Sequence, residues 1–209
     1  MRIFNGVVLF CFLVLGCAPK ERYIYEVDIV EQQGQSLYYF DDSPFSGRII
    51  DDSATARSIT YSVKKGRLNG PTTHRNLAGQ KLLVENYSLG KLDGLVVSYF
   101  DNGLKRSSAQ YINGKKNGQH LLYYPSGGLS KVLFYKDGAL SGDNFLYYKD
   151  GKLQHHFHFN RLGQRHGLWE KFHSNGKRKE KITYDQGILL PPIQRFSVDG
   201  KLITAPRSD

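Results

Sequence analysis

The sequence predicts an all-β protein made of repeated β-hairpins, and three observations lead to this fold class. Glycines recur at intervals of 24 residues, aromatic residues recur in the same register, and 22 Gly, 14 Tyr and 12 Phe contrast with single Trp and Met residues. This composition favours turns and strands. After the first 15 residues no apolar pattern with a helical period is sustained. With 209 residues, 40% hydrophobic and 23% charged, the chain is long enough for a globular core.

The first predicted element is a secretory signal peptide over residues 1–16. Met1-Arg2 gives a positive start, and the run from Ile3 to Leu15 is apolar except for Asn5 and Gly6. A run of this length is too short to span a bilayer as a helix, and it ends at a small residue before a polar segment. We therefore expect this segment to be removed from the mature protein.

The second element is a lipid-anchored acidic tether over residues 17–42. Val14-Leu15-Gly16-Cys17 resembles the bacterial lipobox, whose cysteine becomes the acylated first residue of the mature protein. The resemblance implies a membrane anchor of palmitate-type chains on Cys17, and because Ala18 follows, the outer membrane if the cell has one. Two or more chains, at about 0.8 kcal/mol per CH₂, anchor a protein stably. Cys11 lies in the signal peptide, so no disulfide is expected.

The repeats begin at residue 43 and are predicted to extend to residue 203, followed by a C-terminal tail over 204–209. Three glycine series define them. The first is Gly66, Gly90, Gly114, Gly138, Gly163 and Gly187; the second is Gly70, Gly94, Gly118, Gly142 and Gly167, with Pro191 in the sixth place; the third is Gly79, Gly103, Gly127, Gly151, Gly176 and Gly200. One inserted residue near Asn160-Arg161-Leu162 makes a single interval 25 residues long.

Each repeat divides into two strand-like runs, so we expect one hairpin per repeat. Asn102-Gly103, Asp150-Gly151, Asn175-Gly176 and Asp199-Gly200 are predicted to form type I′ turns, which need positive φ at both central residues. Alternation along a strand puts Val97 and Tyr99 on one face and Val96 and Ser98 on the other.

Aromatic residues form two ladders along the repeats. The first contains Tyr87, Tyr111, Tyr135, Phe159 and Tyr184; the second contains Tyr99, Tyr123, Tyr147, Phe172 and Phe196. A lone hairpin is marginally stable, whereas several strands can share an apolar face. We expect the ladders to form the core; the alternative is a binding platform of exposed rings.

The repeat unit Tyr-x-x-Gly-x-x-x-Gly resembles the MORN repeat, in the bacterial variant found in antitoxin-like repeat proteins and lipoproteins. Residues 111–118, from Tyr111 to Gly118, carry the resemblance most fully, and it covers Ser43 to Ile203. Leu77-Ala78-Gly79 and Pro191-Pro192 depart from the pattern, as capping repeats do. The resemblance implies an elongated, open, antiparallel meander of about 24 residues per repeat.

Charge divides the chain into an acidic beginning and a basic body. Residues 17–56 hold 3 basic and 8 acidic side chains, whereas residues 57–209 hold 25 basic and 11 acidic ones. In a secreted setting this favours anionic lipid, cell-wall polymer or an acidic protein over nucleic acid. The candidate residues for an anionic ligand are Lys64, Lys65, Lys115, Lys116, Lys177, Arg178 and Lys179. Alternatively, these charges are solvated and protect strand edges.

The sequence offers little for catalysis or metal binding. On a strand His156 and His158 share one face, a spacing that permits a metal pair. Phe157 and Phe159 continue the core ladder there, however, so the outward set is explained by the solvent face of the strand. No Gly-x-Ser-x-Gly, His-Glu-x-x-His or glycine-rich phosphate loop is present. No catalytic residue, cofactor or metal is expected, and the protein is not expected to be an enzyme.

The function expected from these features is that of a non-catalytic, lipid-anchored envelope protein whose repeats act as a protein-interaction scaffold. The partner is not identified by the sequence. One alternative is binding of anionic lipid or cell-wall polymer through the basic turns. Another, implied by the resemblance alone, is antitoxin or immunity action against a toxic partner.

Overall fold

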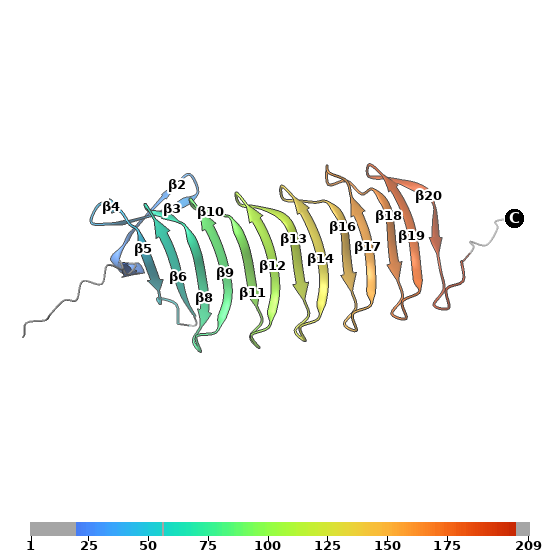
Figure 1. Cartoon of the computed structure of the whole chain (residues 1–209), viewed down its shortest axis with the longest axis horizontal. Helices are drawn as coiled ribbons and strands as arrows, with labels where there is room; N and C mark the ends of the chain where they lie inside the picture. The colour runs from blue at the N-terminus through green and yellow to red at the C-terminus, as the bar shows by residue number, and fades with distance from the viewer. Residues whose placement is uncertain (1–19, 56, 204–209) are drawn as a thin grey trace, which may run out of the picture.

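The computed structural model of the chain describes residues 20–55 and 57–203, which form one long, single-layered β-sheet beside a small three-stranded one (Figure 1). From β5 onward the strands follow one another in chain order, and each pairs antiparallel with its neighbours. The expected fold, an elongated open meander of hairpins, is confirmed. Within the described ranges, no helix is long and apolar enough to cross a membrane.

The elements have the following bounds. They are β1 (Glu21–Tyr23), the 3-10 helix η1 (Ile24–Glu26), β2 (Asp28–Gln32), β3 (Gln35–Phe40), β4 (Ser43–Pro44), β5 (Gly47–Asp51), β6 (Arg57–Lys64), β7 (Arg67–Leu68), β8 (Gly70–Asn76), β9 (Lys81–Ser88), β10 (Lys91–Leu92), β11 (Gly94–Tyr99), β12 (Lys105–Ile112), β13 (Lys115–Tyr123), β14 (Leu129–Lys136), β15 (Ala139–Leu140), β16 (Gly142–Tyr147), β17 (Leu153–Phe159), β18 (Gly167–Phe172), β19 (Arg178–Asp185) and β20 (Ile188–Arg195).

Type I′ turns join the strands along one long side of the sheet, where strand ends meet; we call this side the type I′ edge and the side with the other turns the opposite edge. Both central residues have positive φ at Lys65-Gly66, Leu89-Gly90, Asn113-Gly114, Asp137-Gly138 and Gln186-Gly187. Such turns match the right-handed twist of the strands that they join. The glycines of the first series are therefore the second residues of these turns, except for Gly163.

The predicted type I′ turns at the third glycine series, on the opposite edge, are wrong. There the glycine has positive φ, as at Gly103 (+80°), but the residue before it does not. The N–H of Gly103 donates to the carbonyl of Phe100 at 2.9 Å, and the register shifts between Ser98 and Tyr99. A type I turn that ends in a bulge glycine has this geometry, and it needs one left-handed residue rather than two.

The second glycine series sits opposite the first aromatic ladder. The cross-strand pairs are Gly70 with Tyr87, Gly94 with Tyr111, Gly118 with Tyr135, Gly142 with Phe159 and Gly167 with Tyr184. All five glycines have positive φ, a backbone conformation that favours glycine. A Cβ added at Gly70, Gly94 or Gly118 would approach Ser62, Asn86 or Gln110 of the preceding strand. The Tyr-x-x-Gly-x-x-x-Gly pattern thus encodes a ring, a turn glycine and a second glycine at positive φ that pairs with the ring of the next repeat.

Backbone hydrogen bonds join each repeat to the next along the type I′ edge. The turn glycine donates its N–H to a carbonyl of the preceding repeat: Gly90 to Leu68 at 2.8 Å, Gly114 to Leu92 at 2.7 Å, Gly138 to Lys116 at 2.8 Å and Gly187 to Arg165 at 2.7 Å. On the opposite edge the Tyr124 and Tyr148 hydroxyls donate to the carbonyls of Tyr147 and Phe172, at 2.7 and 2.8 Å. Each repeat is therefore held mainly by its neighbours.

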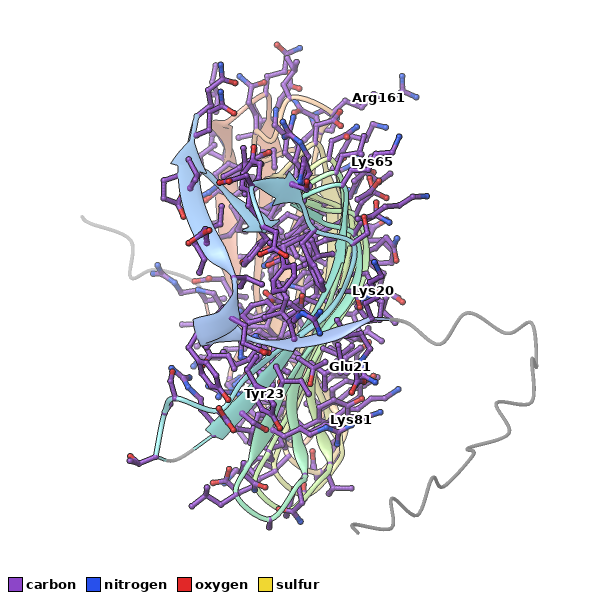
Figure 2. The ribbon with its side chains drawn as sticks, turned by 90° about the vertical axis from the view of Figure 1, so that its left-hand side faces the viewer. Lys20, Glu21, Tyr23, Lys65, Lys81 and Arg161 are labelled. Carbon is purple, nitrogen blue, oxygen red and sulfur yellow. The ribbon has the colours of Figure 1, made fainter. Side chains whose placement is uncertain are left out.

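The described part of the expected tether is folded. Residues 20–42 form β1, η1, β2 and β3, and β1 pairs parallel with β5. Apolar residues within the segment explain this, because Val27, Leu37 and Tyr38 are buried, and Val27 and Tyr38 pack with Ile49 and Val63 of the sheet. Figure 2 shows the N-terminal strands against one side of the curved sheet. The expected signal peptide, Cys17 and the tail over 204–209 lie outside the described residues.

Replacing Gly94 by Ala is expected to destabilise the sheet by about 1–3 kcal/mol, because φ is +110° there and the new Cβ would lie 3.2 Å from the Cβ of Asn86. Urea unfolding followed by circular dichroism measures the change. Gly128→Ala is the matched control: Gly128 has no positive φ and open space around it, so a change within about 0.5 kcal/mol is expected. Equal effects of the two substitutions would contradict this role of Gly94.

Candidate functional site

The sheet has two faces of different chemistry. We call the face that carries Tyr87, Tyr111, Tyr135, Phe159 and Tyr184 the ladder face. The other face, here the opposite face, carries Phe134, Asp143, Phe145, His156 and His158. Alternation along the strands also places Tyr99, Tyr123, Tyr147 and Phe172 of the second ladder on the opposite face. The two ladders are therefore on different sides of one sheet.

The ladder face is covered at its N-terminal end and uncovered beyond it. Tyr38 of β3 lies with its ring 6.1 Å from that of Tyr61, and Phe45 and Val63 are buried beside it. Among the described residues, no second layer continues over the later repeats (Figure 1). The rings there are half-buried, apart from Tyr184, which is buried. The buried N-terminal cluster contains no member of either predicted ladder. The expectation that the ladders form the core is therefore met only in part, because a single layer cannot enclose their rings.

Rings pack against one another on the uncovered part of the ladder face. The Trp169 ring lies 5.2 Å from Phe157, 5.3 Å from Phe159 and 5.2 Å from Tyr184, in tilted and edge-to-face arrangements. Such pairs contribute about 0.5–1.5 kcal/mol each beyond the burial of area. This cluster spans β17, β18 and β19 and holds the rings in fixed positions without a second layer.

Cations lie over these rings. The guanidinium of Arg165 is 5.0 Å from the centre of the Trp169 ring and 5.4 Å from that of Tyr184. The ammonium of Lys116 is 5.0 Å from the Tyr135 ring and 3.2 Å from Nδ1 of His120. Aromatic residues and arginine are the types that dominate binding energy at protein interfaces. The ladder face therefore combines rigid rings with positive charge.

Burial shifts the titration of groups on the ladder face. It lowers the pKa of His120 to about 4, with Lys116 and Lys131 adding to the effect, so this imidazole is neutral at pH 7. Burial also lowers the pKa of Lys116. The pKa of Tyr87 is raised to about 12 by burial and by the Glu85 carboxylate, which keeps its hydroxyl protonated.

The basic residues expected to bind an anionic ligand are divided between the two long edges. Lys64, Lys65, Lys115 and Lys116 lie at the type I′ edge, whereas Lys177, Arg178 and Lys179 lie at the opposite edge. Figure 2 shows Lys65 and Arg161 at one end of the strands and Lys81 at the other.

Several of these charges are already engaged within the chain. Lys177 donates to the carbonyl of Asp199 at 2.8 Å, and Arg178 pairs with Glu170 at 2.7 Å. Lys116 lies over the Tyr135 ring. The seven residues therefore do not form one basic patch.

The histidines of β17 point to both faces, as the alternation predicts. His156 and His158 share the opposite face and contact the Asp143 carboxylate at 2.9 and 3.1 Å, whereas His155 lies on the ladder face. Hydrogen bonds from both imidazoles lower the pKa of Asp143. In the described part of the chain, no group of three or more His, Cys, Asp or Glu side chains is arranged to hold a metal ion.

Sequence reasoning missed the contacts that join different strands. Asp143 lies 13 residues from His156, and Arg165 lies 19 residues from Tyr184, so neither pair forms a local motif. A signal was present for Arg165, because it occupies the place of Lys116 in the repeat, between the first and second glycines. The fold was needed to show that this place lies beside the rings.

In the comparison with known families, the MORN repeat variant matches residues 165–186. The matched segment contains β18 and β19, Gly167 of the second glycine series and the ladder residue Tyr184. The match supports the resemblance to MORN repeats in this part of the chain. No curated protein matches the sequence significantly.

The folded protein is expected to lose stability as the pH falls from about 6.5 to about 4. His120 is neutral over this range when folded, whereas its ordinary pKa is 6.5, so the unfolded chain binds the extra proton. Urea unfolding at pH 7 and pH 4.5 measures the loss, and His120→Gln should reduce it. His155, whose pKa burial also lowers, accounts for part of the remainder. An unchanged difference between the two pH values in the variant would contradict the assignment to His120.

Proposed function

We propose that this protein is a non-catalytic, lipid-anchored envelope protein whose repeats act as a protein-interaction scaffold, with the ladder face as the surface that receives the partner. The observation that carries this proposal is the way in which the N-terminal segment covers the start of the same face. Val27, Tyr38 and Phe45 bury the sheet there, against Ile49 and Val63. The later repeats present the same kind of surface without a cover.

The size of the uncovered face suits a protein partner. Rings or apolar side chains recur on it in each repeat from β9 to β19, over about a hundred residues of sequence. Fully burying one large apolar side chain contributes about 1.5–3 kcal/mol, so several half-buried rings together supply enough apolar area for a stable complex. A partner that covers the face would supply the second layer that sheets ordinarily have.

The charges on the ladder face favour an acidic partner. Lys116 and Arg165 lie over its rings, and residues 57–209 hold 25 basic against 11 acidic side chains. Complementary charge speeds encounter and selects among partners. The proposed partner is thus a protein with an apolar patch rimmed by Asp or Glu.

The proposed anchor rests on the sequence. Cys17 after Val14-Leu15-Gly16 supports acylation, and Ala18 supports the outer membrane in a cell with two membranes. β1 begins at Glu21, four positions after Cys17. The sheet would therefore lie close to the membrane surface rather than at the end of a long flexible tether.

A photo-crosslinking amino acid at position 111 tests the scaffold function in the cells that make the protein. Tyr111 lies on the ladder face and Gln110, its neighbour, on the opposite one. We expect a defined protein adduct from position 111 and little or none from position 110, read by mass shift and mass spectrometry. Position 110 is the matched control, since it has the same place along the strand. Equal adducts from both positions, or none from either, would count against the ladder face as the partner surface.

Replacing Cys17 by Ala tests the anchor. Without the thiol no acyl chain can be attached, so the protein is expected to move from the membrane fraction to the soluble fraction and to change its electrophoretic mobility. Cys11→Ala is the control, because that residue lies in the segment expected to be removed. Unchanged fractionation of the Cys17 variant would rule the anchor out.

A further inference from the structure

The fifth repeat contains the inserted residue, and there the link between neighbouring turns changes. Gly90, Gly114, Gly138 and Gly187 donate their N–H groups to the preceding repeat, but Gly163 donates to Asn160 in its own loop, at 3.0 Å. The side-chain oxygen of Asn160 accepts the N–H groups of Leu162 and Gln164, at 2.9 and 3.0 Å. The loop over residues 160–163 is thus closed by its own hydrogen bonds.

A groove of about 790 Å³ lies beside this loop. Phe134 of β14 and Phe145 of β16 line it from the opposite face of the sheet, and Lys136, Asp143 and Arg161 line its rim. The His156 ring stacks on Phe145 with ring centres 4.9 Å apart and planes 6° apart, which fixes the orientation of that phenyl ring. Two phenyl rings therefore line the groove, and stacking holds that of Phe145.

The acidic and the basic side chains of the groove differ in the contacts that they make within the chain. The Asp143 carboxylate accepts from His156 and His158, and Asp137 accepts from the side-chain amide of Asn117 at 3.0 Å. Lys136 and Arg161 form no ion pair within 4.0 Å among residues 20–55 and 57–203. The groove thus has two acidic and two basic side chains; its carboxylates already accept hydrogen bonds within the chain, which leaves its two cations as the groups that can bind an anion.

We propose that this groove binds an acidic–aromatic peptide segment of the protein partner, with an aromatic side chain on Phe134 and Phe145 and a flanking carboxylate on Arg161 and Lys136. The inference rests on the proposed scaffold function and adds a second contact, on the face away from the aromatic ladder. An aromatic ring can pack offset or edge-on against a held phenyl ring, and an arginine fork can hold a carboxylate with two hydrogen bonds. Small-molecule sites enclose most of their ligand, whereas this groove is open to solvent, as a peptide requires.

The test uses the full-length protein in detergent micelles and the fluorescein-labelled peptide Asp-Glu-Phe-Glu-Asp. Fluorescence anisotropy is expected to show saturable binding below about 1 mM. Replacing the peptide phenylalanine by alanine should weaken binding, since the peptide then has no ring to pack on Phe134 and Phe145. Arg161→Glu should weaken binding about tenfold or more and favour the peptide Lys-Lys-Phe-Lys-Lys instead. Arg161 is exposed in a loop, so this variant is expected to fold.

Lys65→Glu is the matched control, because Lys65 is an exposed cation in another turn of the same edge. Its binding should stay within about twofold of that of the unmodified protein. Three results would each contradict peptide binding in the groove. They are equal losses of affinity in the Arg161 and Lys65 variants, equal binding of the phenylalanine and alanine peptides, and no binding up to about 1 mM. A crosslinked adduct at position 111 that persists in Arg161→Glu would show that the scaffold function holds where the groove fails.

Discussion

The structure depends on glycines at positive φ, because the backbone at the turns and at the starts of the strands adopts conformations that other residues rarely take. In the second glycine series Gly94 pairs with Tyr111 across neighbouring strands, and four equivalent pairs repeat this arrangement along the sheet. In a single-layered sheet a ring is shielded by neighbours on its own face, because no second sheet or helix packs on it. The same glycine adopts a positive φ that bends its strand. Glycine at this position thus permits the backbone conformation that bends each strand beside a ring of the ladder face.

Because the fold is repetitive, a change in the sequence of one repeat affects mainly the contacts of that repeat with its neighbours. Hydrogen bonds from the turn glycines and from Tyr124 and Tyr148 join nearest neighbours, so a local departure need not disturb distant repeats. The inserted residue near Arg161 alters one link and leaves the strands on both sides paired. A one-residue insertion in a hairpin loop changes the loop rather than the register of the sheet when it falls between strands. A distinct surface can therefore arise at one place in an otherwise regular array.

The outermost strands at the two ends of the sheet are protected from pairing with further strands in different ways. At the N-terminal end β1 pairs with β5, and β2–β4 bury an apolar cluster that contains Ile49. At the C-terminal end β20 exposes Ile188, Leu190 and Ile193, but Pro191 and Pro192 within it have no N–H to offer a further strand. The first end is covered and the second is protected chemically, which leaves the faces, rather than the edges, as the surfaces for association.

The sequence by itself determined the β-hairpin repeat and its period, because glycines at positive φ and alternating aromatics are local requirements that any such fold must meet. It placed His156 and His158 on one face for the same reason. It did not determine the turn types, since both kinds of hairpin loop need a glycine in the left-handed region and differ in the residue before it. The folded N-terminal segment, the Asp143 contacts, Arg165 over Trp169 and the groove at Arg161 came from the tertiary structure. These features join residues on different strands, and their formation depends on the register and twist that the assembled sheet imposes.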